Sequence, residues 1–334
     1  MAGPVLLTGG SGFVGGAILE RLVAAGREVR ALARTKDAMD AVAARGAEPV
    51  RGDVLDLTSL VEAMRGCEVV YHAAGVNAMC PRDPRPMYRV NVEGSGNVVR
   101  AAVATGVRRL VYTSSAAAIG EAPGTVGRED SPHRGRYLSH YERSKHLAER
   151  RVLAWAETLG LDVVCVNPSS VQGPGRMGGS ARLLLDLVGG RLPVIVDTRV
   201  SIVDIADCAE GHVLAEAHGR RGERYLLNGF TVTLREAVEL LRRLTGEPRR
   251  VRFAPRWVAR AAGEAAELAR ALTRRELPLC RESVRTLLHG HRYDGSRAER
   301  ELGLRYTSME ETVRRTLAWY AERGLAPPLR DGPD

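Results

Sequence analysis

The sequence lacks any apolar run of about 18 residues, the length that a membrane-spanning helix requires. Its uncharged N-terminus also lacks the basic leader of a secretory signal. Aromatic residues make up only 4% of the 334 positions, too few to suggest stacking platforms for nucleic acid. These absences predict a cytoplasmic protein with no membrane span and no nucleic-acid partner.

Cysteine is also scarce, and its spacing is uninformative. The five cysteines lie far apart and form no CxxC pair. We therefore expect reduced thiols rather than a disulfide framework, and we expect no metal site. The five are Cys67, Cys80, Cys165, Cys208 and Cys280.

Lysine is nearly absent. The chain carries 49 basic residues and a formal net charge of +9, yet only Lys36 and Lys145 are lysines. The arginines are scattered rather than gathered in one stripe, which favours a solvated, arginine-rich surface over a nucleic-acid footprint. The two lysines stand out against this background.

Apolar periodicity predicts alternating strands and helices over the first half of the chain. This alternation, with short loops, predicts an α/β fold in which helices cover both faces of a parallel sheet. The regularity fades after Pro168, so we divide the chain into residues 1–168 and residues 169–334, the latter completing the sheet and forming a mostly helical lobe. The expected strands are 5–8, 28–34, 47–53, 67–75, 107–115 and 161–168, and the expected helices are 13–26, 38–46, 57–66, 87–106 and 139–160.

A glycine-rich turn joins the first strand to the first helix. The segment TGGSGFVG (residues 8–15) places Gly9, Gly12 and Gly15 in a TGxxGxxG pattern. Gly9 permits a tight turn, Gly12 lets a pyrophosphate approach the backbone, and Gly15 lets helix and strand pack closely. The helix N-terminus attracts the anion, so this turn predicts a dinucleotide site.

The end of the second strand bears on the choice of dinucleotide. The chain reads Ala33-Arg34-Thr35-Lys36 there, with no acid before Asp37. An acid at this point would hydrogen-bond the ribose of NAD, whereas Arg34, assisted by Lys36, can bind the 2′-phosphate of NADP. We therefore favour NADP(H) and leave NAD(H) open. Asp53, at the end of the third strand, is expected beside the adenine.

The clearest chemical signal is the pair Tyr141 and Lys145. Four residues apart on a helix, they share one face. A chain with nine tyrosines and two lysines rarely forms this pair by chance. The ammonium of Lys145 is expected to lower the pKa of Tyr141 and enable proton transfer. Ser115, at the carboxyl end of the fifth strand, can hydrogen-bond a substrate carbonyl oxygen.

Together these motifs resemble the extended short-chain dehydrogenases/reductases, especially the branch of dihydroflavonol 4-reductase and 3β-hydroxysteroid dehydrogenase. The matching segments include TGGSGFVG, YHAAG, VYTSSAAAIG, YERSK and NPSSVQGPG. The resemblance implies a Rossmann-type doubly wound parallel sheet of about seven strands with a smaller, mostly helical substrate lobe. It also implies a catalytic triad of Ser115, Tyr141 and Lys145, supported by Asn91.

The predicted cofactor-binding set follows from the glycine turn, the strand ends and this resemblance. Pro168 and the segment after it would flank the nicotinamide. The complete set is Thr8, Gly9, Gly12, Phe13, Val14, Gly15, Arg34, Lys36, Asp53, Val54, Ala73, Ala74, Gly75, Thr113, Tyr141, Lys145, Pro168, Ser170 and Val171.

Departures from the family pattern narrow the reaction. Ser115 is followed by three alanines rather than an acid pair, which argues against a sugar-nucleotide dehydratase. Arg34 argues against a permanently bound NAD. The sequence thus predicts an NADPH-dependent reductase of a ketone or aldehyde on a small organic molecule, probed further below.

Three alternatives stay open at this point. The chain could be an NAD-dependent hydroxysteroid-type dehydrogenase, a nucleotide-sugar epimerase, or a nucleotide-sensing regulator without catalysis. Residues 77–88, 173–185 and 253–292 are expected to wall the substrate pocket, and an amphipathic helix at 254–272 could cover that pocket, form a dimer face or lie on a membrane. A homodimer is neither required nor excluded.

Overall fold

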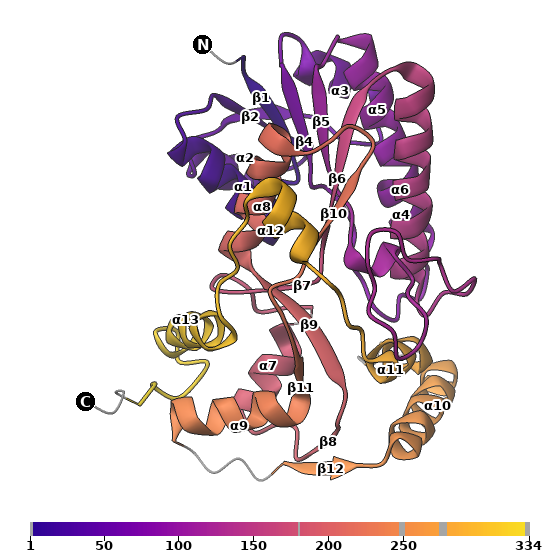
Figure 1. The fold of residues 1–334 in the computed structure, drawn as a ribbon, viewed down its shortest axis with the longest axis vertical. Coiled ribbons are helices and arrows are strands. Elements are labelled where there is room, and N and C mark those ends of the chain that lie inside the picture. The colour runs from indigo at the N-terminus through magenta and orange to yellow at the C-terminus, as the bar shows by residue number, and fades with distance from the viewer. Residues whose placement is uncertain (1–2, 180, 247–250, 274–278, 331–334) are drawn as a thin grey trace.

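The protein is described here from a computed structural model, which describes residues 3–179, 181–246, 251–273 and 279–330 (Figure 1). Its main sheet has seven parallel strands in the order β10-β6-β5-β4-β1-β2-β3. This confirms the expected doubly wound sheet. The strands are β1 (Val5–Thr8), β2 (Val29–Ala33), β3 (Glu48–Arg51), β4 (Val69–His72), β5 (Arg109–Thr113), β6 (Asp162–Pro168) and β10 (Arg224–Leu227).

Helices cover both faces of this sheet, as Figure 1 shows. Successive strand residues point to opposite faces, so Leu7 packs on the side of α1, α8 and α12, while Leu6 packs on the side of α3, α5 and α6. Both leucines are fully buried. The helices are α1 (Phe13–Ala24), α2 (Lys36–Ala43), α3 (Leu57–Met64), α5 (Ser95–Ala104), α6 (His140–Leu159), α8 (Ile205–His218) and α12 (Ser296–Leu302).

The long helix expected at 87–106 is not continuous. It consists of α4 (Arg85–Tyr88), a π-helical segment (Arg89–Gly94) and α5. The widened segment contains Asn91, one of the predicted site residues. A π-helical turn changes the direction in which a side chain leaves the helix, and such turns are frequent at functional sites.

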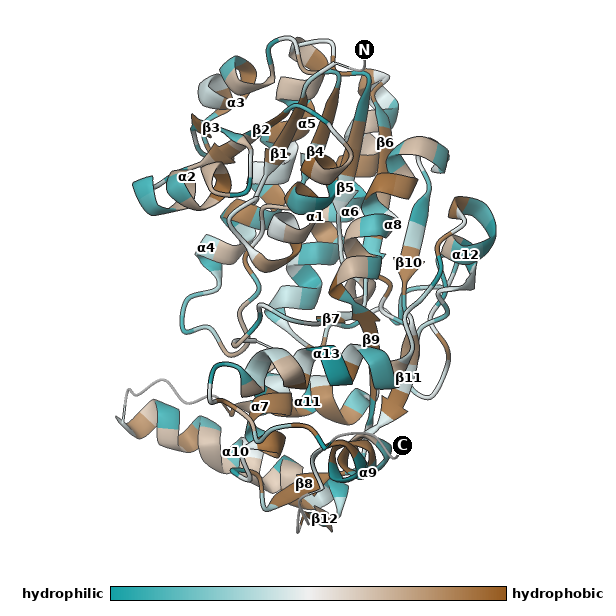
Figure 2. Ribbon diagram, turned by 90° about the vertical axis from the view of Figure 1, so that its left-hand side faces the viewer, coloured by the Kyte–Doolittle hydropathy of each residue, from teal (hydrophilic) through white to brown (hydrophobic). Residues whose placement is uncertain are grey.

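The C-terminal lobe lies below the carboxyl ends of the main strands in Figure 1. It contains two small sheets, one in the order β11-β9-β7 and the other pairing β12 with β8. Leucines of α7, α9 and α13 form its separate core, and these elements carry brown apolar segments in Figure 2. The strands are β7 (Ser170–Gln172), β8 (Val194–Val196), β9 (Arg199–Asp204), β11 (Phe230–Thr233) and β12 (Arg252–Ala254), and the helices are α7 (Ala181–Val188), α9 (Leu234–Thr245), α10 (Arg256–Thr273), α11 (Arg281–His289) and α13 (Met309–Ala321).

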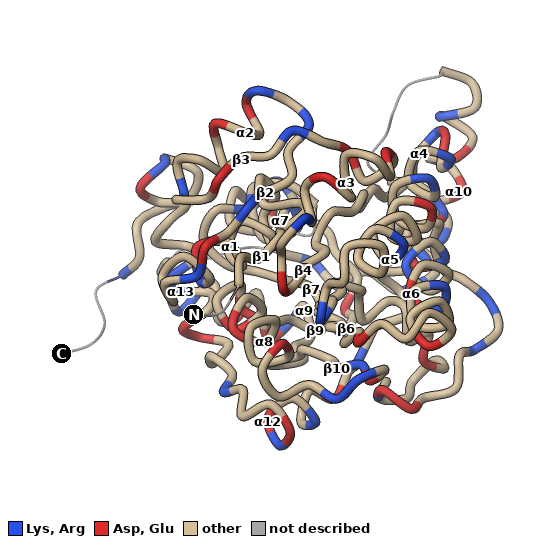
Figure 3. Tube along the Cα trace, turned by 90° about the horizontal axis from the view of Figure 1, so that it is seen from above, with Lys and Arg blue, Asp and Glu red and all other residues tan. Residues whose placement is uncertain are grey.

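The helix expected at 254–272 is α10, which packs against α11. Gly263 is its only buried residue, and Trp257, Leu268 and Leu272 are 63–75% exposed. Among the described helices, none is both long and apolar enough to cross a membrane. Seen from above, residues of both charge signs are distributed mainly over the outer helices and loops (Figure 3).

Candidate active site

The glycine turn between β1 and α1 forms a cradle that only glycine can build. Gly9 has a φ of +78°, and a Cβ there would lie 2.6 Å from the Ala74 nitrogen. A Cβ at Gly15 would lie 2.1 Å from the Gly9 oxygen, so helix and turn touch at this point. No side chain caps the N-terminus of α1 at Gly12. The free amide groups of the first turn therefore fit the pyrophosphate of a dinucleotide.

A buried polar chain supports this turn from the neighbouring strand. The Thr8 hydroxyl lies 2.7 Å from His72 Nδ1 and accepts a hydrogen bond from the Ala74 amide at 3.2 Å. His72 Nε2 lies 3.0 Å from the Ser95 hydroxyl. Burial, and then the charge of Lys145, lowers the pKa of His72 to about 3, so its ring is neutral. The chain thus fixes Thr8 and the Ala73–Gly75 segment against each other without adding a charge.

Two exposed charged residues lie where the adenosine ribose is expected. Arg34 Nη1 is 3.7 Å from Asp53 Oδ2, and the two side chains are 67% and 36% exposed. Lys36 is exposed at the first position of α2, after the N-cap residue Thr35. Val54 follows Asp53 and is buried, and its carbonyl accepts a hydrogen bond from Asn97 at 3.0 Å. An exposed guanidinium with one weak partner can bind an incoming phosphate.

The three predicted catalytic residues come from β5, the turn after it, and α6. Ser115 caps the short 3₁₀ helix Ala116–Ala118 and accepts a hydrogen bond from the Ala117 amide at 3.2 Å. Its side chain also hydrogen-bonds to Tyr141. Lys145 follows Tyr141 by one helical turn, and its ammonium donates to the Thr113 carbonyl at 2.8 Å. The hydroxyl pair and the ammonium therefore meet at the carboxyl end of β5.

The expected effect of Lys145 on Tyr141 is wrong for this structure. Burial raises the pKa of Tyr141 above 10.0, and the two influences that lower it are the Ser115 hydrogen bond and the charge of Arg176. The Lys145 ammonium is directed to Thr113 and lies 5.1 Å from the centre of the Tyr112 ring. Tyr141 is therefore protonated at neutral pH.

Lys145 is itself perturbed by its surroundings. Burial lowers its pKa from 10.5 to about 8, although the charge of Glu149 acts in the opposite direction. Glu149 is buried and holds Arg224 at 2.8 Å and Asn167 at 2.5 Å. A lysine with a lowered pKa in a cleft is typical of functional sites.

Asn91 is a positioning residue in this structure. Its amide nitrogen donates to the Val76 carbonyl at 3.0 Å and to the Ser144 hydroxyl at 2.9 Å, and its oxygen accepts from the Val76 amide at 2.7 Å. These contacts join the loop after β4 to α6. They hold the helix face of Tyr141 in register with the end of the sheet.

Arg176 is a site residue that sequence reasoning missed. It lies 5.3 Å from the centre of the Phe13 ring and donates to the Val171 carbonyl at 2.9 Å. Its charge also acts on Tyr141. The residue belongs to the glycine-rich loop after β7, where nothing distinguishes it from other arginines of the sequence. Three of its neighbours, Phe13, Val171 and Tyr141, are predicted site residues.

The remaining predicted residues lie at the ends of β6 and β7. Pro168 ends β6, and Ser170 and Val171 begin β7. The Ser170 hydroxyl accepts a hydrogen bond from Gln172 at 3.1 Å. The hydroxyl of Ser169, between the two strands, is buried without a partner.

The expectation that all five cysteines are reduced is wrong. Cys80 and Cys280 form a disulfide with an S–S distance of 2.04 Å, whereas Cys67, Cys165 and Cys208 are free and buried. The bond joins the loop after β4 to the N-cap of α11. The two cysteines are 200 residues apart, and no spacing rule connects residues that the tertiary fold brings together.

Comparison with known proteins identifies the class that this fold and site define. Residues 5–227 match the model of the NAD-dependent epimerase/dehydratase family, and the chain belongs to that family. It is therefore an extended short-chain dehydrogenase/reductase and an NAD(P)-dependent oxidoreductase.

Individual relatives extend over most of the chain. It is 35% identical to sterol demethylase protein B of Methylococcus capsulatus over 96% of this chain and 99% of that one. It is 33% identical to the 4-hydroxy-2-methyl-3-oxo-4-farnesyl-3,4-dihydroquinoline-1-oxide ketoreductase of Stigmatella aurantiaca, over 89% and 90%. The crystal structure of gox2253 superposes with a TM-score of 0.85 at 29% identity, covering 97% of this chain and 99% of that one.

Proposed function

We propose that the protein is an NADPH-dependent reductase of a ketone or aldehyde carried by a small organic molecule. The observation that carries this proposal is the hydrogen-bonded pair Ser115 and Tyr141 beside Lys145, at the sheet edge that also bears the glycine turn. A protonated tyrosine held by a serine is suited to donate a proton to a carbonyl oxygen.

The chemistry divides between the cofactor and the chain. NADPH, when bound, supplies the hydride that reaches the carbonyl carbon. Tyr141 donates its proton to the carbonyl oxygen, so that the ketone becomes an alcohol, and Ser115 orients that oxygen by a hydrogen bond. The raised pKa of Tyr141 favours this direction because the residue starts protonated at neutral pH. Lys145 offers its ammonium to the ribose hydroxyls and stabilises the phenolate left after proton transfer.

The preference for NADP(H) over NAD(H) rests on Arg34. Its side chain is 67% exposed and has Asp53 as a distant partner at 3.7 Å. Lys36 adds a second exposed cation at the N-terminus of α2. A charge-assisted hydrogen bond to a phosphate stabilises by about 1.5–3 kcal/mol. Arg34→Ala should therefore weaken NADPH binding by roughly tenfold to a hundredfold and leave NADH binding nearly unchanged, as measured by fluorescence titration.

The names of the relatives support a carbonyl substrate on a lipophilic molecule. One is the farnesyl-quinoline ketoreductase described above, and two others are named 2-alkyl-3-oxoalkanoate reductase, at 30–31% identity. All three reduce a ketone by name, and each name includes an alkyl or isoprenoid chain. We therefore propose a ketone on a largely apolar molecule as the first substrate class to examine.

The test is NADPH oxidation with a panel of alkyl and cyclic ketones. Tyr141→Phe should reduce turnover by roughly 10²–10⁴-fold or more, because it removes the proton donor, while NADPH binding survives. Tyr137→Phe is the matched control, since Tyr137 precedes α6 and stacks on His133 and His146. Full turnover in Tyr141→Phe would refute the mechanism, and a native protein that binds NADPH but reduces no ketone would favour the regulator.

A further inference from the structure

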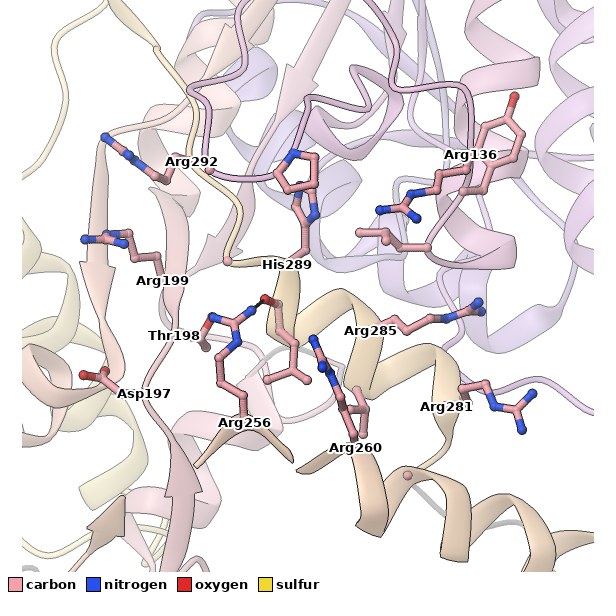
Figure 4. Close-up of a pocket in the computed structure, with 18 of the residues that line it drawn as sticks. Arg136, Asp197, Thr198, Arg199, Arg256, Arg260, Arg281, Arg285, His289 and Arg292 are labelled. Carbon is pink, nitrogen blue, oxygen red and sulfur yellow. Dashed lines mark hydrogen bonds between the residues drawn. The ribbon is translucent and has the colours of Figure 1, made fainter. Parts of the chain in front are cut away.

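A cavity of about 770 Å³ lies between the loop that precedes α6, the start of β9, and helices α10 and α11 (Figure 4). None of the residues predicted for catalysis or cofactor binding lines it. Part of its wall comes from the segment 253–292, as expected for a pocket, but the segments 77–88 and 173–185 contribute nothing. The cavity is therefore a second candidate site that the proposed function does not use.

Arginine is strongly enriched in this cavity. Seven of its twenty lining residues are arginines, whereas 47 arginines among 334 residues would place about three in such a sample. Only two lining residues are acidic, and both already have partners. Asp197 lies 3.3 Å from Arg235, outside the cavity, and Glu264 holds Arg281 at 2.5 and 2.8 Å. The wall thus carries a large excess of positive charge.

Most of these guanidinium groups have no partner. Within the described part of the chain, five lining arginines form neither an ion pair nor a side-chain hydrogen bond. The other two bind Glu264 and the Leu288 carbonyl. Like charges gathered around one space repel one another, and an anion in that space would relieve the repulsion. The five are Arg136, Arg199, Arg260, Arg285 and Arg292.

The frame that carries these arginines is held at several points. The N-cap of α11 is joined to Cys80 by the disulfide, and the Leu287 carbonyl accepts a hydrogen bond from Thr198 at 2.7 Å. At the other end of α11, His289 lies 3.1 Å from the buried carboxylate of Glu121, which also contacts His291 at 2.6 Å. Glu121 is thereby engaged by two histidines and does not offset the arginines. A wall fixed in this way binds an anion with little reorganisation.

We propose that this cavity binds the phosphate groups of a ligand that carries at least two of them. The planar fork of arginine matches phosphate oxygens, and several unpaired forks call for a polyvalent anion. Apolar residues, Leu138, Val284 and Leu288, share the wall and suit the organic part of such a ligand. A cavity of this volume is typical of small-molecule sites, whereas a nucleic acid would need an extended basic stripe.

Phosphate groups can reach the cavity from two sources. One is a soluble phosphorylated molecule, and the other is the headgroup layer of an anionic lipid surface. The second source is relevant because α10, which contributes Arg256 and Arg260, also exposes Trp257, Leu268 and Leu272. Exposed aromatic and aliphatic residues beside arginines are typical of helices that lie on a lipid surface.

The first experiment titrates the native protein with inorganic pyrophosphate by calorimetry at constant ionic strength. The double variant Arg260→Ala/Arg285→Ala should bind pyrophosphate at least tenfold more weakly, since each residue contributes a charge-assisted hydrogen bond. The control is Arg65→Ala/Arg305→Ala, which removes the same charge from two exposed arginines outside the cavity. It should bind as the native protein does. Pyrophosphate held only at the glycine turn would be insensitive to the cavity variant and would overturn the proposal for the soluble source.

A second experiment measures sedimentation with vesicles of phosphatidylglycerol or phosphatidylcholine. Binding to phosphatidylglycerol that is lost in Arg260→Ala/Arg285→Ala but kept in the control supports the headgroup source. If the cavity variant changes neither pyrophosphate nor vesicle binding, the proposal is refuted. NADPH affinity should be equal in all three proteins, because the predicted cofactor residues lie outside the cavity. A native protein that does not bind NADPH would contradict the proposed function and leave the phosphate test unaffected.

Discussion

Replacing Gly15 by alanine tests the glycine cradle, and the neighbouring glycine provides the control. A Cβ at Gly15 would lie 2.1 Å from the Gly9 oxygen and 2.6 Å from the Gly9 carbon. Both are backbone atoms, and the same oxygen accepts the Gly12 amide at 2.9 Å. Neither atom can rotate away, so the turn itself must shift by about 1 Å to restore van der Waals contact.

The magnitude follows from the geometry. Overpacking of this kind costs about 1–3 kcal/mol, and the shift would misalign the amide groups that face the pyrophosphate. At Gly16 the nearest atom to a new Cβ is the Gly10 oxygen at 3.4 Å, an ordinary contact. Gly16→Ala should therefore gain up to about 1 kcal/mol from helix propensity. We expect the two variants to differ by about 2 kcal/mol or more.

The assay is urea unfolding of both variants, followed by NADPH titration. Gly15→Ala should unfold at lower urea concentration than the native protein and bind NADPH at least tenfold more weakly. Gly16→Ala should match or exceed native stability and keep native affinity. Equal stability and equal NADPH affinity in the two variants would refute the account of the turn.

Three further predictions follow from the buried groups. The kcat/KM for NADPH should fall as pH rises through about 8, because the ammonium of Lys145 is lost there; a profile that stays flat above that pH, or one that Lys145→Arg leaves unchanged, would contradict this role. Reduction of the Cys80–Cys280 bond, which joins positions 200 residues apart, should lower the free energy of unfolding by about 2–4 kcal/mol. The check is urea unfolding with and without dithiothreitol, and Cys80→Ser should lose the difference. Asn91→Ala removes three hydrogen bonds between a loop and α6 and should cost about 1–3 kcal/mol, with kcat lowered more than NADPH affinity; native values of both would argue against a positioning role.

The sequence predicted those parts of the fold that depend on local pattern. Strand-turn-helix periodicity located β1 and α1, and the chemistry of glycine explains the positive φ of Gly9. The helical spacing of Tyr141 and Lys145 fixed their common face. Each of these signals lies within a few residues, where backbone geometry determines the outcome.

Features formed by distant residues could not be read in this way. The disulfide between Cys80 and Cys280, the approach of Arg176 to Tyr141, and the arginine cavity all join segments that tertiary packing brings together. The direction of the pKa shift of Tyr141 was missed for a related reason. Spacing places Lys145 on the same helix face, but burial and the Thr113 carbonyl determine what the ammonium contacts.

The central claim is net carbonyl reduction, and transfer of labelled hydrogen tests it most directly. The native enzyme would be mixed with a reactive ketone and NADPH carrying deuterium at the transferable position of the nicotinamide. Mass spectrometry would then follow the product alcohol. We predict one deuterium in each alcohol molecule and one NADPH consumed for each alcohol formed. A protein that isomerises a nucleotide sugar without consuming NADPH, and leaves no deuterium in any alcohol, would contradict the account and identify an epimerase instead.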